Sequence, residues 1–151
     1  MNIIAEFSHS IITELNYKVT KSTSSIIKDQ IDKLEHVKES TQGRLAIQND
    51  LTSFMVEIVT DLTSVVDEKP YRSLELSINF FFDLIVKDQN GEDFKITDEN
   101  NKEIMMEIYE NVESLFLVMC RQQLKEIIRQ VTSIDYQLPI ITEKIKVSFV
   151  E

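Results

Sequence analysis

The longest periodic stretch of the chain is residues 100–139, NNKEIMMEIYENVESLFLVMCRQQLKEIIRQVTSIDYQLP. Its apolar residues recur at intervals of three and four, as in an amphipathic helix that buries one face. They begin with Ile104, Ile108, Val112, Leu115 and Met119. At about 1.5 Å per residue, about 30 helical residues span about 45 Å. The sequence therefore predicts one helix that is long for a small domain.

The apolar stripe of this helix widens at residues 115–119, LFLVM. Such width exceeds what one packed face needs, so the helix must lie between a sheet and a second cover. A second copy of the protein is the most economical cover. We therefore predict that Leu115 and Met119 contact a polypeptide client or another subunit.

A long strand is predicted at residues 73–86, SLELSINFFFDLIV. Apolar and polar residues alternate there with period two, the pattern of a half-buried strand. The turn-like residues 67–70, DEKP, precede it, so residues 53–66 are its expected hairpin partner. Phe81 and Ile85 interrupt the polar face. We predict that these two residues form an exposed client or oligomer interface.

The other segments are less clearly patterned. Residues 44–66 fit a helix by their spacing and a strand by their β-branched and aromatic content; we favour the strand. Residues 3–20 favour a strand bent near Ser8–Ser10 over a helix, with Ile11, Thr13, Leu15, Tyr17 and Val19 on one side. Residues 22–42 are expected to be a helical or mobile insertion. A short strand is expected at 94–97, and a strand or short helix after Pro139.

Composition narrows the function. The 151 residues suit a single domain, and the formal net charge of −10 disfavours nucleic acid and anionic membranes as partners. No apolar run is long enough to span a bilayer and no signal peptide is apparent, so we expect a cytoplasmic protein without membrane insertion. His9 and His36 lack partners at metal-ligand spacing, and Cys120 lies in the helix stripe as a core residue. We expect no catalytic site, metal or cofactor, and hence no enzyme.

Three stretches resemble the SecB export chaperones. They are ITELNY at residues 12–17, YRSLELSINFFF at 71–82, and FLVMCRQQLKEII at 116–128, with Arg121, followed by YQLPII at 136–141. The resemblance implies an α+β fold in which a four-stranded antiparallel sheet packs against one long C-terminal helix. It also implies homo-oligomers, dimers or tetramers, that bind unfolded polypeptide without a cofactor.

The resemblance also assigns one partner-binding residue. Glu14 matches an acidic position with which SecB proteins contact the export motor SecA. Lys18 departs from the pattern, because a second acidic residue is expected there. The tail after Pro139 is shorter than the family's second helix, which contributes to its client groove.

Three functions follow from these patterns. The first is a SecB-like chaperone, or an adaptor derived from one, that binds extended or unfolded polypeptide. The alternative is a small acidic phage or mobile-element protein that binds and modulates one folded target. A helical assembly module is the third, and it requires residues 51–65 to be helical.

Overall fold

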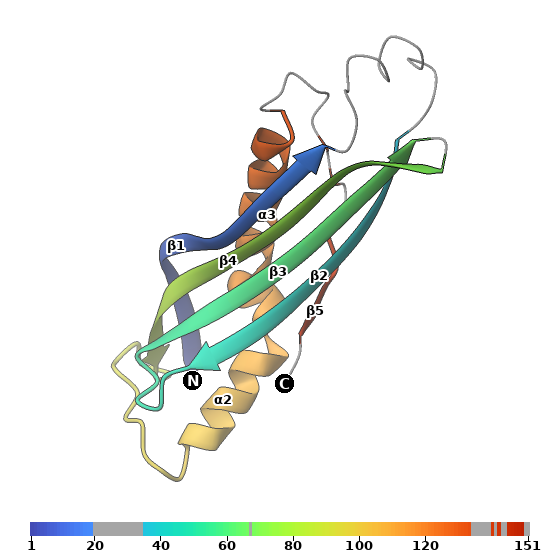
Figure 1. The fold of residues 1–151 in the computed structure, drawn as a ribbon. Coiled ribbons are helices and arrows are strands. Elements are labelled where there is room, and N and C mark those ends of the chain that lie inside the picture. Colours follow the sequence, from blue (N-terminus) through green and yellow to red (C-terminus); the bar gives the residue numbers. More distant parts are fainter. Residues whose placement is uncertain (20–34, 67, 134–139, 141, 143–144, 150–151) are drawn as a thin grey trace.

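The computed structural model describes residues 1–19, 35–66, 68–133, 140, 142 and 145–149. Five strands form one sheet in the order β1-β4-β3-β2-β5, crossed on one face by a long helical segment (Figure 1). The strands are β1 (Asn2–Val19), β2 (His36–Ile47), β3 (Ser53–Val66), β4 (Lys69–Lys87) and β5 (Val147–Phe149). The helical segment comprises α2 (Asn101–Glu110), the π-helical turn η1 (Glu113–Leu117) and α3 (Val118–Val131).

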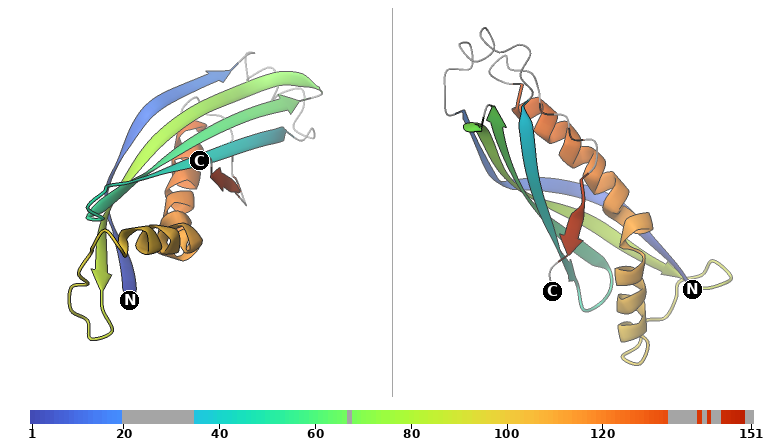
Figure 2. Two further views of the ribbon diagram at one scale, coloured as in Figure 1. Left: turned by 90° about the horizontal axis from the view of Figure 1, so that it is seen from below. Right: turned by 90° about the vertical axis from the view of Figure 1, so that its right-hand side faces the viewer.

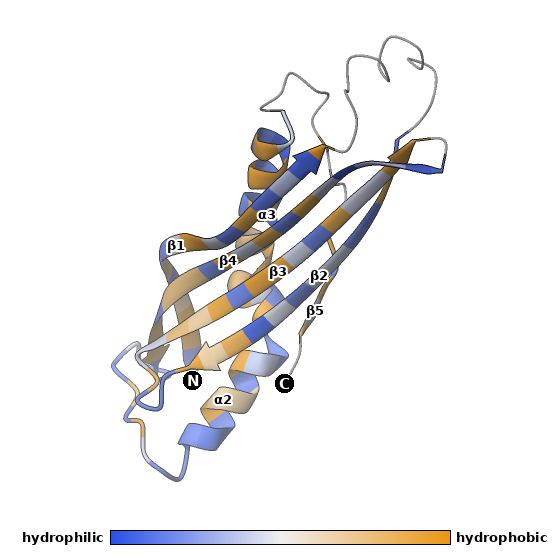
Figure 3. Ribbon diagram, in the orientation of Figure 1, coloured by the Kyte–Doolittle hydropathy of each residue, from blue (hydrophilic) through white to orange (hydrophobic). Residues whose placement is uncertain are grey.

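The sheet curves around the helices, so one face of the sheet is covered by them and the other is not (Figure 2). On the face toward the helices, here the helix face, β4 buries Leu74, Leu76, Ile78, Phe80 and Phe82. The opposite face, here the outer face, carries the alternate and mostly polar residues of β3 and β4. Bands of opposite hydropathy along these strands show the alternation (Figure 3). The predicted hairpin of residues 53–86 is confirmed, because β3 pairs antiparallel with β4.

The widened apolar stripe of the helix coincides with η1. A π turn holds one residue more than an α turn, so it can direct two adjacent residues toward the same side. Phe116 and Leu117 are accordingly both buried, at 2% and 4% exposure. An ion pair between Glu113 and Arg121 spans the turn on its outside. Part of the wide apolar stripe, which the sequence led us to assign to contact with a second subunit, is therefore buried in the core of the same chain.

Three expectations are corrected. The sheet has five strands and is mixed, because β5 joins β2 in parallel; an all-antiparallel sheet of four is wrong. Residues 36–42 of the expected insertion belong to β2, whereas residues 22–34 lie outside the described residues. Residues 94–97 form no strand; the residue before them, Asp93, makes an isolated bridge with Lys87. The preferred strand at 44–66 is confirmed on both sides of the turn at Leu51.

A buried arginine ties the upper end of the fold together. Arg72 of β4 has a side chain 1% exposed, and its guanidinium donates to both carboxylate oxygens of Glu35, at 2.6 and 2.7 Å. It also donates to the carbonyl of Thr132 after α3, at 3.2 Å, and to the hydroxyl of Tyr17 in β1, at 3.4 Å. These charge-assisted hydrogen bonds raise the pKa of Arg72 against the opposing effect of burial, which is the larger single influence.

Gly43 of β2 marks a close approach between β2 and β5. A Cβ atom at this position would lie 2.8 Å from the ring of Phe149 and 2.9 Å from Val147, both in β5. We expect Gly43→Ala to lower the free energy of unfolding by about 1–3 kcal/mol, because overpacking displaces side chains or backbone. Urea denaturation measures this change. Adding Phe149→Ala should recover part of the loss; no recovery would place the strain elsewhere.

Candidate protein-binding surface on the first strand and the outer face

Strand β1 is a long edge of the sheet. Within the described part of the chain it pairs with β4 alone, so one side of an 18-residue strand keeps unpaired N–H and C=O groups. Such an edge is a template for pairing with another chain unless charge, proline or a covering element blocks it. No described helix or strand covers the middle of this edge (Figure 1), although Glu6 and Glu14 bring charge to it.

Two register shifts put apolar side chains on both faces of β1. One lies between Phe7 and His9 and the other between Ile12 and Glu14, which indicates β-bulges at Ser8 and Thr13. The first confirms the predicted bend at Ser8–Ser10. Residues on the helix face are Phe7, Ile12 and Leu15, and residues on the outer face are Ile4 and Ile11. All five are exposed, at 39–49% of their surface. The prediction that Ile11 shares a side with Leu15 and Tyr17 is therefore wrong.

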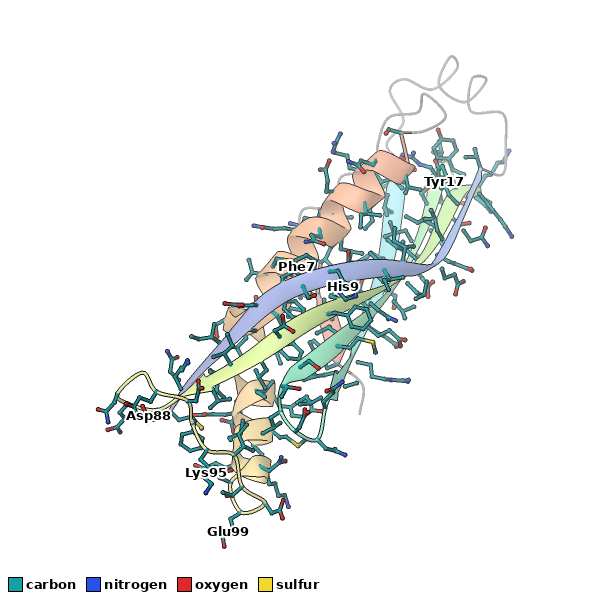
Figure 4. The ribbon with its side chains drawn as sticks, turned by 90° about the vertical axis from the view of Figure 1, so that its left-hand side faces the viewer. Phe7, His9, Tyr17, Asp88, Lys95 and Glu99 are labelled. Atoms are coloured by element: carbon teal, nitrogen blue, oxygen red, sulfur yellow. The ribbon has the colours of Figure 1, made fainter. Side chains whose placement is uncertain are left out.

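The bulge at Ser8 also builds a cavity on the outer face. His9 pairs with Phe81 of β4, Phe81 with Met55 of β3, and Met55 with Ala46 of β2, which makes one row across four strands. The rings of His9 and Phe81 stack with centroids 4.5 Å apart, whereas Phe7 meets Phe82 on the helix face. Figure 4 labels Phe7 and His9 along β1. Together with neighbouring residues the row lines an open cavity of about 430 Å³, here the outer-face pocket.

The size and lining of the outer-face pocket suit side chains of a partner. Its volume falls within the range of small-ligand sites, and its side chains are largely apolar with a polar margin at Ser8, Gln48 and Asp83. Ser8 Oγ and His9 Nδ1 lie 2.9 Å apart, which orients the imidazole on Phe81. The pocket can thus hold one or two apolar side chains.

The outer face that carries this pocket is predominantly acidic, and one of its acidic residues, Asp83, lines the pocket. The acidic residues of the outer face are Glu6, Glu14, Glu57, Asp61, Glu75 and Asp83, against the basic Lys18, Lys38, Arg44 and Lys87. Acidic side chains therefore outnumber basic ones on this face. A segment that combines apolar and basic residues would be complementary to it.

The structure separates the predicted interface residues into two places. Phe81 lines the outer-face pocket, Ile85 lies on the same face opposite Ile4, and Glu14 is exposed on that face opposite Ser77. Leu115 belongs to η1, is half-buried, and lines a smaller cavity with Met1 and Ile3. Met119 is half-buried in α3, where its sulfur accepts a hydrogen bond from Gln123.

Sequence reasoning missed His9, Met55 and Ala46. Each is unremarkable in its own strand, and only the register of four strands aligns them with Phe81. In the sequence, the exposed apolar residues of β1 appear only as an irregular alternation of apolar and polar residues. The two bulges that cause this irregularity cannot be located from the sequence. For Cys120 the expectation of a core residue is confirmed; burial raises the pKa of its thiol to about 12.

Comparison with known proteins gives a likeness of fold. No protein-family model and no curated protein matches the sequence. Among solved structures, the chain is similar to a SecB-like chaperone from Mycobacterium tuberculosis, solved in complex with a ChAD peptide from the HigA1 antitoxin. The identity is 9% and the TM-score 0.60, over 94% of this chain and 91% of that one. A Streptococcus agalactiae protein of unknown function aligns with a TM-score of 0.38 at 9% identity, over 95% and 100% of the two chains.

This likeness concerns architecture and carries no residue roles. The α+β arrangement of a sheet against a C-terminal helix is shared with a SecB-like chaperone. In the described part of the chain, no helix is long and apolar enough to cross a membrane.

Proposed function

We propose that this chain is a non-enzymatic, polypeptide-binding protein: a SecB-like chaperone, or an adaptor derived from one, that takes extended or unfolded segments. The observation that carries the proposal is the outer-face pocket of about 430 Å³, beside the exposed apolar side chains Ile4 and Ile11 on the same face of β1. Support also comes from the fold of a SecB-like chaperone that was solved with a bound peptide. The proposed setting is the cytoplasm.

Self-association is part of the proposal. Two copies of β1 can pair edge to edge about a twofold axis, because a twofold contact joins the same surface of both subunits. Such pairing would satisfy the free backbone groups of β1 and cover Phe7, Ile12 and Leu15. The homo-oligomer, a dimer or a tetramer, would leave the outer-face pocket open for polypeptide.

Polypeptide binding would use apolar anchors. An extended segment places alternate side chains on one side, and pockets for such side chains provide selectivity. Phe81 and its row would hold an anchor, while Glu14, Asp83 and their acidic neighbours would favour basic residues nearby.

Aggregation of an unfolded protein tests the function. Reduced and carboxymethylated α-lactalbumin, which cannot fold, should bind the chain in fluorescence anisotropy, and the chain should suppress light scattering of a heat-denatured client. The alternative is an acidic protein that modulates one folded target; the acidic outer face favours it. Binding to a folded partner with no affinity for α-lactalbumin would select that alternative.

Phe81→Ala is expected to weaken binding of carboxymethylated α-lactalbumin about tenfold, since the loss of one aromatic contact corresponds to about 1.4 kcal/mol. The fold should persist, because Phe81 is half-buried on the outer face and outside the core cluster. Anisotropy titration measures the change. Ser77→Ala, on the same strand and face but outside the pocket, is the matched control. Equal affinities of the two variants would remove the pocket from the binding site.

A further inference from the structure

Strand β5 occupies a small part of a longer edge. It pairs in parallel with Thr41, Gln42 and Gly43 of β2, a strand of twelve residues. Elsewhere along β2 the described residues place no strand on that side. A segment longer than β5 can therefore form more backbone hydrogen bonds with β2 than β5 does.

The surface beneath β5 is shaped for bulky side chains. Thr41 and Gly43 face the helices and are buried, and Val147 and Phe149 lie directly on them. Gly43 has an ordinary backbone conformation, so the need for glycine comes from the close approach of Phe149. The ring of Phe149 also meets Phe116 of η1 edge-on, with centroids 6.4 Å apart.

The side chains of this C-terminal segment indicate which kind of peptide can bind at the edge of β2. Ile145, Val147 and Phe149 alternate with polar residues, and Ile145 is 3% exposed. Val147 and Phe149 are only partly buried. The preferred ligand is therefore an extended segment with two aliphatic residues and an aromatic residue at every second position, running parallel to β2 (Figures 1 and 2).

We propose that β5 is a built-in occupant of a peptide-accepting edge on β2, and that an extended apolar segment of a client displaces it. The strand thus acts as an autoinhibitory strap: it shields Thr41, Gly43 and Phe116 when no client is present and competes with weakly binding segments. This inference rests on the proposed polypeptide-binding function and adds a second binding place, at the edge opposite β1.

A reversible disulfide tests the displacement in the full chain. Gln42 and Ser148 are register partners with exposed side chains, and neighbouring strands lie about 4.8 Å apart, within the Cα separation that a disulfide needs. The variant Gln42→Cys/Ser148→Cys should lock β5 when oxidised and free it when reduced. Cys120 should stay inert near pH 8, because burial raises its pKa to about 12. Ser40→Cys/Asp61→Cys joins β2 to β3 instead and is the matched control.

The probe is a fluorescein-labelled peptide of residues 145–151, IKVSFVE, with a scrambled peptide beside it. We expect the reduced Gln42→Cys/Ser148→Cys variant to bind IKVSFVE at least tenfold more tightly than the oxidised form. The control pair should bind equally in both states. Equal binding by the locked and reduced forms, or none by either, would overturn the inference.

Carboxymethylated α-lactalbumin separates this inference from the proposed function. Tighter binding to the reduced form supports both. Equal binding to the two forms refutes displacement of β5 by a client and leaves polypeptide binding in place. If neither form binds α-lactalbumin while IKVSFVE still distinguishes them, the proposed function fails and β5 remains an exchangeable strand on β2.

Discussion

Glu35→Ala is expected to lower the free energy of unfolding by about 3–5 kcal/mol, the largest effect of any single change considered for this chain. Removing one partner of a buried ion pair leaves the other charge uncompensated, which costs more than the pair contributes. Arg72 is the partner left behind, with a side chain 1% exposed. The change removes its two shortest hydrogen bonds, whereas the longer ones to Tyr17 and Thr132 remain. Chemical denaturation followed by circular dichroism measures the loss.

Substitution of the other partner, Arg72, provides a comparison in which a smaller loss of stability is expected. Arg72→Met should cost less than Glu35→Ala, about 3 kcal/mol, because the Glu35 side chain is 22% exposed and can regain water. The double variant should be more stable than the sum of the two losses predicts, since both charges of the Arg72–Glu35 pair are removed together. Strict additivity of the two losses would show that the pair is not coupled.

The parts of the fold that sequence could predict are those with an unbroken period. Strand β4 alternates in burial from Arg72 to Lys87, because one of its faces is buried and the other is not. The helix was equally clear, and its wide stripe was a genuine signal whose cause, the π turn at Phe116 and Leu117, has no sequence rule. Strand β2 was hidden, because its buried positions include the small residues Thr41 and Gly43, which do not read as apolar.

The candidate site was predictable only in part, for a related reason. Phe81 and Ile85 could be found because they break an alternation within one strand. Their neighbours depend on register between strands, which a hydrophobic pattern does not specify on a face that is not buried. At Ser8 and Thr13 the bulges change the face of every following residue, and neither position carries the glycine that often marks one. At the second bulge, the Thr13 hydroxyl donates a hydrogen bond to the backbone carbonyl of Ser77 in the neighbouring strand, at 3.2 Å.

Ile12→Lys/Leu15→Lys is expected to weaken self-association about 1,000-fold, if two copies pair through β1 as proposed. Both side chains lie on the helix face of β1 and keep 46% and 48% of their surface exposed. Burying the rest of each contributes about 1 kcal/mol, and a twofold dimer contains four such side chains, about 4 kcal/mol in all. Every 1.4 kcal/mol corresponds to about a tenfold change in Kd.

Sedimentation equilibrium of the wild type and the variant over micromolar concentrations measures this change in Kd. The two lysines are expected to act through their position on the edge strand. Lysine at an edge strand both removes apolar contact and opposes pairing, because its ammonium must remain hydrated. The isolated subunit should keep its stability, since neither side chain belongs to the buried core. Met106→Lys, at a position of α2 that is 57% exposed, introduces one lysine away from Ile12 and Leu15 and should leave self-association unchanged. A wild-type chain that stays monomeric, or a variant that dimerises as well as Met106→Lys, would place the function of the β1 edge with clients instead of a second subunit.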